Sequence, residues 1–488
     1  MAEDSHRRRR TKIVATIGPA SDDPAVLTAM IDAGMDTARV GLAHGSIEVS
    51  LDRLRRIRAA AAERRREVGI MADLPGPKIR AAAYPEGGVV LGEGDRVELV
   101  PSAPGGDRST WARTAVDHQS LLDELREGDL VALGDGGVQL AVESVSATAA
   151  ISVVRSGGRL QGRPGVNLPP DRFSADTPTP EDLRLLEAMT AAGIDAAAIS
   201  FVRRAEDVRT VQRAVGPGGP ALIAKIETKT AVEGIDEIIA TADGVMVARG
   251  DLGVRMPLED VPHLQKRIIR AGVSYGRPVI TATQMLESMI HAPTPTRAEV
   301  SDVANAVFDG SSAVMLSGET AIGHDPALVV ATMSRITERA ERDFDYAGWG
   351  SKLGRQQTAA MADAPAAVRI TSAITAAAWR AASDSDAAAI ICCTNTGATA
   401  RAIARFRPTA PLLAYTPSAR VARQLTFAWG VDARATEQYH SADEIVWFAV
   451  KDAVERGVVQ HGQIVVVLVG SPGTDEPTTD VLRMVRIR

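Results

Sequence analysis

Eight short apolar runs alternate with amphipathic stretches along the first two-thirds of the chain, and this rhythm limits the fold more than any other feature. Short runs rich in β-branched residues are typical of buried strands, and the stretches between them repeat apolar residues at helical spacing. Eight βα units in chain order predict an α/β fold of the TIM (β/α)8 barrel type. The predicted strands are Lys12–Ile17, Thr37–Leu42, Val68–Leu74, Ala197–Val202, Ala221–Glu227, Gly244–Arg249, Pro278–Thr283 and Ala313–Leu316.

The rhythm breaks once, between the third and fourth predicted strands. Residues 78–177 carry Gly-Gly and Gly-Asp turns between short alternating runs such as Arg96–Val100, Leu130–Leu133 and Gln139–Val145. This pattern predicts a small β-barrel domain inserted into a barrel loop, with the Pro-rich segment Arg163–Asp182 as a hinge-like return. The barrel itself is then expected over residues 1–77 and 178–345.

A third region is expected over residues 346–488, beginning with a connector rich in Gly, Gln and Ala at Ala347–Ala364. Its predicted strands are separated by helical patterns, which fits an open, mostly parallel α/β sheet. These strands are Ala387–Thr394, Pro411–Tyr415, Val431–Ala433 and Gln463–Val469.

Composition excludes several classes of function. The 488 residues carry a net charge of −6, which argues against general nucleic-acid binding, and no apolar run is long enough for a membrane span. The basic segment Arg7–Arg10 is interpreted as a frayed tail rather than a targeting signal. Two adjacent cysteines, Cys392 and Cys393, lie in an apolar run and are expected to be buried thiols, in keeping with a cytoplasmic protein.

Polar residues stand at or just beyond the carboxyl ends of the predicted barrel strands, which is where barrel enzymes carry their sites. One polar strand end is ordinary, because strand ends are solvated, but polar residues at so many of them predict a shared site. The residues concerned are Arg39, Asp73, Lys225, Glu227, Arg249–Asp251, Thr283 and Ser317–Thr320.

The fifth strand is the most informative. Lys225 and Glu227 are two residues apart and therefore project from the same face, either as a plain ion pair or as part of a site. Asp251 adds a second carboxylate, and Gly250 lets backbone amides approach an anion. Two carboxylates with substrate oxygens suit Mg²⁺ or Mn²⁺. The cations Arg39, Arg80 and Lys225 suit a phosphorylated, carboxylated substrate.

Several segments resemble the pyruvate kinase family, and the resemblance covers nearly the whole chain. They are TKIVATIGPAS (Thr11–Ser21), ALIAKIE (Ala221–Glu227), GVMVARGDLG (Gly244–Gly253), TATQMLESMI (Thr281–Ile290), PTPTRAEVSDVANAVFDG (residues 293–310) and VMLSGETAIG (Val314–Gly323). The resemblance implies phosphoryl transfer from phosphoenolpyruvate to ADP in glycolysis, giving pyruvate and ATP. It also implies a homotetramer.

The resemblance assigns a role to each matching residue. Lys225 would lie against the transferring phosphoryl group, Glu227 and Asp251 would hold the divalent metal, and Thr283 would lie near the carbon that receives a proton. Arg39 and Arg80 would contact phosphate, and amides at Gly250 and Asp251 would take the substrate carboxylate. Ser317 and Glu319 would support proton relay. The implied nucleotide contacts are Arg39, His44 and Asp135, while Glu181 stands where the family usually has lysine.

The chain departs from the family around the monovalent cation. Gly41, Ala43 and Leu74 replace residues whose oxygens hold potassium in most members, and Lys78 replaces a glutamate. Only Asp73 of that cage remains. We expect the Lys78 ammonium to stand in for potassium, so that K⁺ is not required. A decayed site in a weak paralogue is the alternative interpretation.

The loop after the first strand of the C-terminal region could bind a phosphorylated effector. It contains Thr394, Asn395, Thr396, Gly397 and Thr399 at the start of a predicted helix, and plain N-capping by threonine is the alternative. Two other functions stay open for the whole chain. One is a regulatory paralogue that binds phosphoenolpyruvate and turns over poorly; the other is a different enolpyruvate enzyme on the same barrel.

Overall fold

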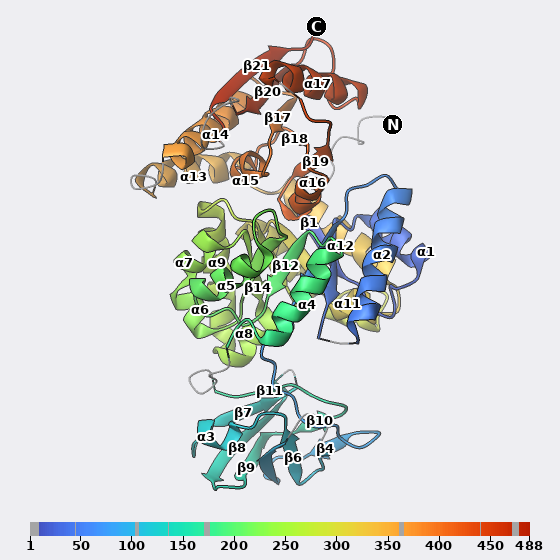
Figure 1. Ribbon diagram of the computed structural model, residues 1–488, viewed down its shortest axis with the longest axis vertical. Coiled ribbons are helices and arrows are strands. Elements are labelled where there is room, and N and C mark those ends of the chain that lie inside the picture. The colour runs from blue at the N-terminus through green and yellow to red at the C-terminus, as the bar shows by residue number, and fades with distance from the viewer. Residues whose placement is uncertain are drawn as a thin grey trace.

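The computed structural model describes residues 9–43, 45–102, 107–134, 136–169, 176–360, 366–439, 441–470 and 478–488. Eight parallel strands close into a barrel in the order β1-β16-β15-β14-β13-β12-β3-β2, as the alternating rhythm predicts (Figure 1). The strands are β1 (Lys12–Thr16), β2 (Thr37–Gly41), β3 (Gly69–Asp73), β12 (Ala196–Ile199), β13 (Ala221–Ile226), β14 (Gly244–Ala248), β15 (Val279–Ala282) and β16 (Ala313–Leu316).

Helices surround this barrel and cover the outer faces of its strands. They are α1 (Pro24–Ala33), α2 (Ile47–Glu63), α4 (Pro180–Ala191), α5 (Ala205–Val215), α6 (Lys229–Glu233), α7 (Ile235–Thr241), α8 (Arg249–Arg255), α9 (Val261–Ser274), α10 (Arg297–Asp309), α11 (Gly318–Ala321) and α12 (Pro326–Arg342). The lumen is filled by alternate strand residues such as Val14, Met71, Ile223 and Met246. The barrel is therefore a packed core, and its chemistry is confined to the rims.

Between β3 and α4 the chain forms the inserted domain, which lies beyond the carboxyl ends of the barrel strands (Figure 1). A six-stranded sheet in the order β11-β7-β8-β9-β5-β6 and a two-stranded sheet β10-β4 enclose an apolar core of their own. The elements are β4 (Val89–Leu91), β5 (Arg96–Pro101), β6 (Arg113–Val116), α3 (Leu121–Glu124), β7 (Leu130–Leu133), β8 (Val138–Val145), β9 (Ala150–Ser156), β10 (Gly158–Leu160) and β11 (Val166–Asn167).

The C-terminal region packs on the opposite end of the barrel and holds a five-stranded sheet in the order β19-β18-β17-β20-β21 (Figure 1). Four strands are parallel and β21 is antiparallel, so the open α/β prediction is confirmed. The elements are α13 (Tyr346–Ala360), α14 (Ala366–Asp384), β17 (Ala389–Cys393), α15 (Ala398–Ala404), β18 (Leu412–Thr416), α16 (Ala419–Gln424), η3 (Leu425–Phe427), β19 (Val431–Ala435), α17 (Ala442–Glu455), β20 (Ile464–Val469) and β21 (Val481–Arg486).

The segment expected to be a connector at Ala347–Ala364 is instead the helix α13, so that prediction is wrong over Tyr346–Ala360. Its glycines allow close packing rather than bending: a Cβ on Gly350 would lie 2.3 Å from the Trp379 ring. Trp349 anchors the helix by donating its indole N–H to the Arg405 carbonyl oxygen at 2.8 Å. These contacts are long-range, which is why local composition misses them.

The basic N-terminal segment is also corrected where the structure describes it. Arg9 donates to Asp36 at 2.7 Å, and the Arg10 guanidinium lies 5.5 Å from the ring centres of both Tyr346 and Trp429. These two arginines are therefore structural, while Arg7 and Arg8 lie outside the described residues. Both cysteines are free and buried, as expected. No helix in the described part of the chain is long and apolar enough to cross a membrane.

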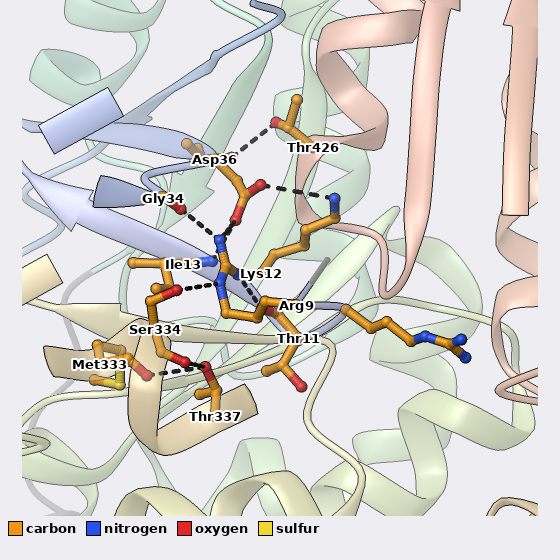
Figure 2. A network of polar contacts seen from close by, with 12 residues as sticks. Arg9, Thr11, Lys12, Ile13, Gly34, Asp36, Met333, Ser334, Thr337 and Thr426 are labelled. Carbon is orange, nitrogen blue, oxygen red and sulfur yellow. Dashed lines mark hydrogen bonds and ion pairs between the residues drawn. The ribbon is translucent and has the colours of Figure 1, made fainter. Parts of the chain in front are cut away.

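Asp36 lies at the centre of a polar network beside β1 (Figure 2). Its carboxylate accepts hydrogen bonds from Arg9 and from the Ile13 amide, and Lys12 Nζ lies 3.7 Å away. Burial works against the charged form, but Arg9 and Lys12 outweigh it and hold the pKa of Asp36 below its ordinary value. Lys12 also donates to the Val431 carbonyl oxygen at 2.9 Å, so this network joins the barrel to the C-terminal region.

Asp36→Asn is expected to lower the free energy of unfolding at pH 7 by about 3 kcal/mol, because Arg9 is left buried without its counter-charge. Since the pKa of Asp36 is lower in the folded state, its contribution is present above pH ~4 and is lost as the pH falls through the folded value. Urea unfolding at pH 7 and at acid pH measures both effects. The matched control is Asp52→Asn in an exposed ion pair, which should change little; equal losses in the two variants would contradict the account.

Candidate active site

The predicted rim residues do meet, and Lys225 on β13 lies at their centre with only 9% of its surface exposed. Its ammonium nitrogen donates to Ser200 Oγ at 2.7 Å and lies 2.8 Å from Glu227 Oε1 and 3.3 Å from Asp73 Oδ1. Lys225 and Glu227 are thus on one face, as their spacing predicts. One cation held by oxygens from three neighbouring strands leaves its ammonium fixed at the barrel mouth.

The charges around Lys225 determine its protonation. Burial favours the neutral amine, but Asp73, Glu227 and Asp251 outweigh burial and raise the pKa of Lys225 above its ordinary value. Burial likewise acts against the Asp73 carboxylate, yet Lys225 and Arg39 lower the pKa of Asp73. The site therefore carries a permanent ammonium at physiological pH, which is suited to stabilising negative charge on a substrate.

Arg39, in the middle of β2, forms the second cation of the site. Its Nε and Nη2 both lie 2.7 Å from Asp73 Oδ2, and its Nη1 donates to Thr16 Oγ1 at 3.0 Å. The guanidinium is thus held in one orientation by β1 and β3 together. Asp73 is shared by Arg39 and Lys225, so one carboxylate positions both cations.

Glu227 and Asp251 fit a divalent cation by the chemistry of their donors. Glu227 is fully buried, and its Oε2 accepts the Phe201 amide at 2.8 Å. Its other oxygen, Oε1, lies 2.8 Å from the Lys225 ammonium. Burial raises the pKa of the Glu227 carboxyl, the Lys225 charge opposes this rise, and the nearby Asp251 charge adds to it, so that the pKa lies above its ordinary value. A divalent cation such as Mg²⁺ or Mn²⁺ would neutralise the repulsion between these two carboxylates.

The segment after β14 is fixed to the end of β15. Arg249 donates to the Thr283 carbonyl oxygen at 2.6 Å and to Asp302 at 2.8 Å. The Gly250 amide donates to Thr283 Oγ1 at 2.8 Å, so it is already used within the protein. Thr283 has a φ of 69°, a costly conformation for a β-branched residue, and these contacts maintain it. The Asp251 amide remains at the N-terminus of α8, where an anion can approach.

Ser317 and Glu319 lie at the end of β16. Glu319 is fully buried and accepts backbone amides from Ser317 at 2.6 Å and Leu286 at 3.1 Å. It thereby joins the loops after β15 and β16. The Ser317 hydroxyl is buried and has no hydrogen-bond partner among the described residues, so it is available to a ligand or water.

The hinge residues are placed differently from the expectation. Lys78 is exposed, and its Cε lies 3.3 Å from a Cβ built on Gly165. Within the described residues it makes no ion pair with Asp73, whose partners are Arg39 and Lys225. Arg80 donates to the Arg163 carbonyl oxygen at 3.3 Å, inside the inserted domain, and is not brought to Lys225. The distances of the Lys78 and Arg80 side chains from Asp73 and Lys225 therefore depend on the position of the inserted domain.

The return of the hinge is anchored by Asp182, which is buried and accepts the Gly76 amide at 2.9 Å. Its neighbour Glu181 points to solvent and pairs with Arg184 at 2.7 Å. The remaining predicted nucleotide contacts, His44 and Asp135, lie outside the described residues.

Three residues near the site were missed from the sequence. Ser200 joins Lys225 to the Leu74 carbonyl oxygen, and Phe201 supplies an amide to Glu227 from a φ of 56°. Arg255 lies with its guanidinium 5.0 Å from the Phe201 ring centre. The one available signal was Ser200, a polar residue at the end of the otherwise apolar fourth strand.

Comparison with known families agrees with this geometry. Residues 8–330 match the pyruvate kinase barrel domain, and residues 372–485 match the pyruvate kinase alpha/beta domain. The chain belongs to the pyruvate kinase family. It is 41% identical to the pyruvate kinase of Methylorubrum extorquens over 98% of this chain and 97% of that protein. It is 39% identical to the Geobacillus stearothermophilus enzyme over 98% of this chain and 80% of that protein. Family membership makes the chain a phosphotransferase with a TIM-barrel core.

Proposed function

We propose that the chain transfers the phosphoryl group of phosphoenolpyruvate to ADP, giving pyruvate and ATP. The observation that carries the proposal is the Lys225 ammonium, held between Asp73, Glu227 and Ser200 beside Arg39. In this reaction the bond from phosphorus to the enol oxygen breaks and a bond to the β-phosphate oxygen of ADP forms. Charge develops on the transferred oxygens, and positioned cations stabilise it with no covalent step by the protein.

Each residue has a part in that reaction. Lys225 would bind the phosphoryl group and the enolate oxygen as it forms, while Arg39 would orient the phosphate. The Asp251 amide would take the carboxylate, while the Gly250 amide stays bonded to Thr283. Thr283 lies on the side where the enolate carbon accepts its proton, and Ser317 and Glu319 would order the water that delivers it. Glu227 and Asp251 would hold Mg²⁺ or Mn²⁺, which neutralises phosphoryl charge when bound.

Closure of the inserted domain over the barrel rim would complete the active site. We assign residues 78–177 to that domain. On closure, Arg80, Asp135 and Lys78 would approach the rim of the barrel. The nucleotide would then lie between the two domains, in contact with Arg39, His44 and Asp135. Exclusion of water on closure protects the phosphoryl group from hydrolysis. The test is pyruvate formation with and without ADP. A regulatory paralogue would bind phosphoenolpyruvate without turnover, and a different enolpyruvate enzyme would act without ADP.

We further propose that the enzyme does not require potassium. Both Asp73 oxygens are engaged by Arg39 and Lys225, and Leu74 is buried in the barrel core. Gly41 has no side-chain oxygen, although a Cβ there would meet nothing within 4 Å. A monovalent cation would thus find too few oxygens to replace its hydration shell. Lys78 begins the path into the inserted domain, and closure would move its ammonium relative to Asp73.

Turnover in tetramethylammonium chloride is therefore expected to equal turnover in potassium chloride at matched ionic strength. Lys78→Glu alone should not create potassium dependence, because no side-chain oxygens are added at Gly41, Ala43 or Leu74. The fourfold variant with Gly41→Asn, Ala43→Ser, Leu74→Thr and Lys78→Glu should become potassium-activated. Strong activation of the wild type by potassium would contradict the proposal.

Regulation and assembly are proposed on the same basis. Thr394 Oγ1 accepts the Gly397 amide at 3.0 Å, and Thr396 Oγ1 accepts the Ala398 amide at 3.4 Å, so these hydroxyls shape the loop that Asn395 and Thr399 complete. Arg401 Nη1 would lie 2.9 Å from a Cβ on Gly397 and supplies the positive charge that Asn395 lacks. A phosphorylated effector would bind there. We also propose a cytoplasmic homotetramer, in keeping with membership of the pyruvate kinase family.

A further inference from the structure

A small cavity lies between the floor of the barrel and the C-terminal region, at the opposite end from Lys225. Its volume is about 20 Å³, larger than the ~10–15 Å³ that one water needs by the same measure. Residues just before β15 and β16 form one wall, and residues at the end of α15 and after η3 form the other. The polar residues that line it are Arg277, Ser312, Arg401, Arg405, Arg407 and Trp429.

Four of these residues are arginines, and no carboxylate among the described residues lines the cavity with them. In the part of the chain that the structure describes, no carboxylate forms an ion pair with any of the four; Asp243 acts on Arg277 and Arg401, and Glu341 on Arg407, from beyond ion-pair distance. Arg405 and Arg407 are only 9% and 2% exposed. Burial lowers the pKa of Arg401, Arg405 and Arg407 to about 10, so all three still carry their charge at neutral pH. Buried charge without a counter-ion is costly.

Arg407 is held by aromatic rings. Its guanidinium lies about 5 Å from three aromatic ring centres, those of Phe344, Trp349 and Trp429. It also donates to the Ser311 carbonyl oxygen at 2.8 Å. Arg405 lies 5.2 Å from the Phe406 ring centre and donates to the Ser274 carbonyl oxygen at 3.4 Å and to Ser372 Oγ at 3.1 Å, and Arg277 donates to the Ala240 carbonyl oxygen at 3.3 Å. All of these partners are neutral, so they position the guanidinium groups without supplying a counter-charge.

The cavity also gathers unused hydrogen-bond donors. Arg277 Nε, Arg405 Nε and Trp429 Nε1 are buried and have no partner among the described residues. Trp429 is only 3% exposed, so water cannot readily satisfy its indole N–H from outside. Leaving a buried donor unsatisfied is unfavourable, and three that line one cavity call for an acceptor inside it. A single water accepts two hydrogen bonds and brings no charge, whereas a tetrahedral oxyanion supplies four oxygens and a negative charge.

We propose that this cavity binds a small inorganic oxyanion of the phosphate or sulfate type, with Arg277, Arg405 and Trp429 as its donors and Arg401 as an additional counter-charge. The anion would join α15 to the segment that leads into β15, the strand that ends beside Thr283. Arg401 also lies beside Gly397, so this site and the candidate effector loop share one guanidinium. The role of the anion is to stabilise the junction between the barrel and the C-terminal region.

The test is thermal unfolding in increasing inorganic phosphate, with chloride at matched ionic strength as the reference. Wild type should show a saturable rise in Tm of about 2–4 °C in phosphate over chloride. Trp429→Phe keeps a ring against Arg407 but removes the indole donor, and Arg405→Met removes a donor and a charge. Both variants should lose most of that rise. Arg213→Met, at an exposed surface ion pair, is the matched control and should keep it.

Two further variants identify phosphate bound elsewhere. Lys225→Met weakens the catalytic site, and Thr396→Val removes a loop hydroxyl that bonds the Ala398 amide; both should retain the rise. The proposal is overturned if wild type shows no rise beyond chloride. It is also overturned if Trp429→Phe retains the full rise, or if the rise disappears in Lys225→Met or Thr396→Val instead. A purely structural role for Arg405 would lower Tm equally in the two salts.

Discussion

Lys225→Met is expected to lower kcat by about 10³-fold while leaving the fold intact. The ammonium stabilises charge that is greatest in the transition state, so its removal reduces turnover more than substrate binding. The fold should persist because Asp73 keeps its two contacts with Arg39 and Glu227 keeps the Phe201 amide. Steady-state kcat and KM, together with equilibrium binding of phosphoenolpyruvate, separate the two effects.

Lys229→Met is the matched control for this substitution, because Lys229 is exposed at the start of α6, four residues along the same chain segment. It should behave as wild type. Lys225→Arg should not rescue activity, since a planar guanidinium cannot fit the point-charge position between Asp73 and Glu227. A Lys225→Met enzyme that keeps more than a tenth of wild-type turnover would show that another group carries the transition-state charge.

Glu227→Gln and Asp251→Asn are each expected to raise the Mg²⁺ concentration for half-maximal rate by at least about tenfold, because each removes one of two protein carboxylates. The amides keep the shape of the acids, and Gln at 227 can still accept the Phe201 amide. A titration of Mg²⁺ against rate, together with direct Mn²⁺ binding, measures the loss. Glu233→Gln and Asp236→Asn change exposed carboxylates nearby and should leave both curves unchanged. Unaltered half-saturation in both site variants would place the metal elsewhere.

Much of the fold follows from local patterns. All eight barrel strands lie where short apolar runs predict them. The helices α1 and α12 begin after Asp23 and Asp325, whose side chains cap them and are of a residue type that marks helix starts in a sequence. Failures occur where distant contacts decide. The helix α13 tolerates its glycines because it packs against Trp379 and is bonded to the Arg405 carbonyl oxygen. The strand β21 was not expected because its alternating pattern over Val481–Arg486 is short and includes charged residues.

The part of the site that lies on the barrel strands was predictable from the sequence, and the part on the hinge was not. Lys225, Glu227, Arg39 and Asp73 meet because parallel strands deliver their carboxyl ends to one rim. Lys78 was expected to take the place of potassium beside Asp73, yet its side chain lies near Gly165. Ser200 was overlooked because a serine at the end of an apolar strand is a weak signal until its neighbour is known to be Lys225.

The decisive measurement for phosphoryl transfer at this site is the ratio of ATP to pyruvate formed from phosphoenolpyruvate and ADP, with Mg²⁺ as the only added metal. Phosphoryl transfer at Lys225 predicts one ATP for each pyruvate at every time point, and no pyruvate when ADP is omitted. Pyruvate that accumulates without ADP, or phosphoenolpyruvate that binds and remains unconverted when ADP is present, would contradict the account.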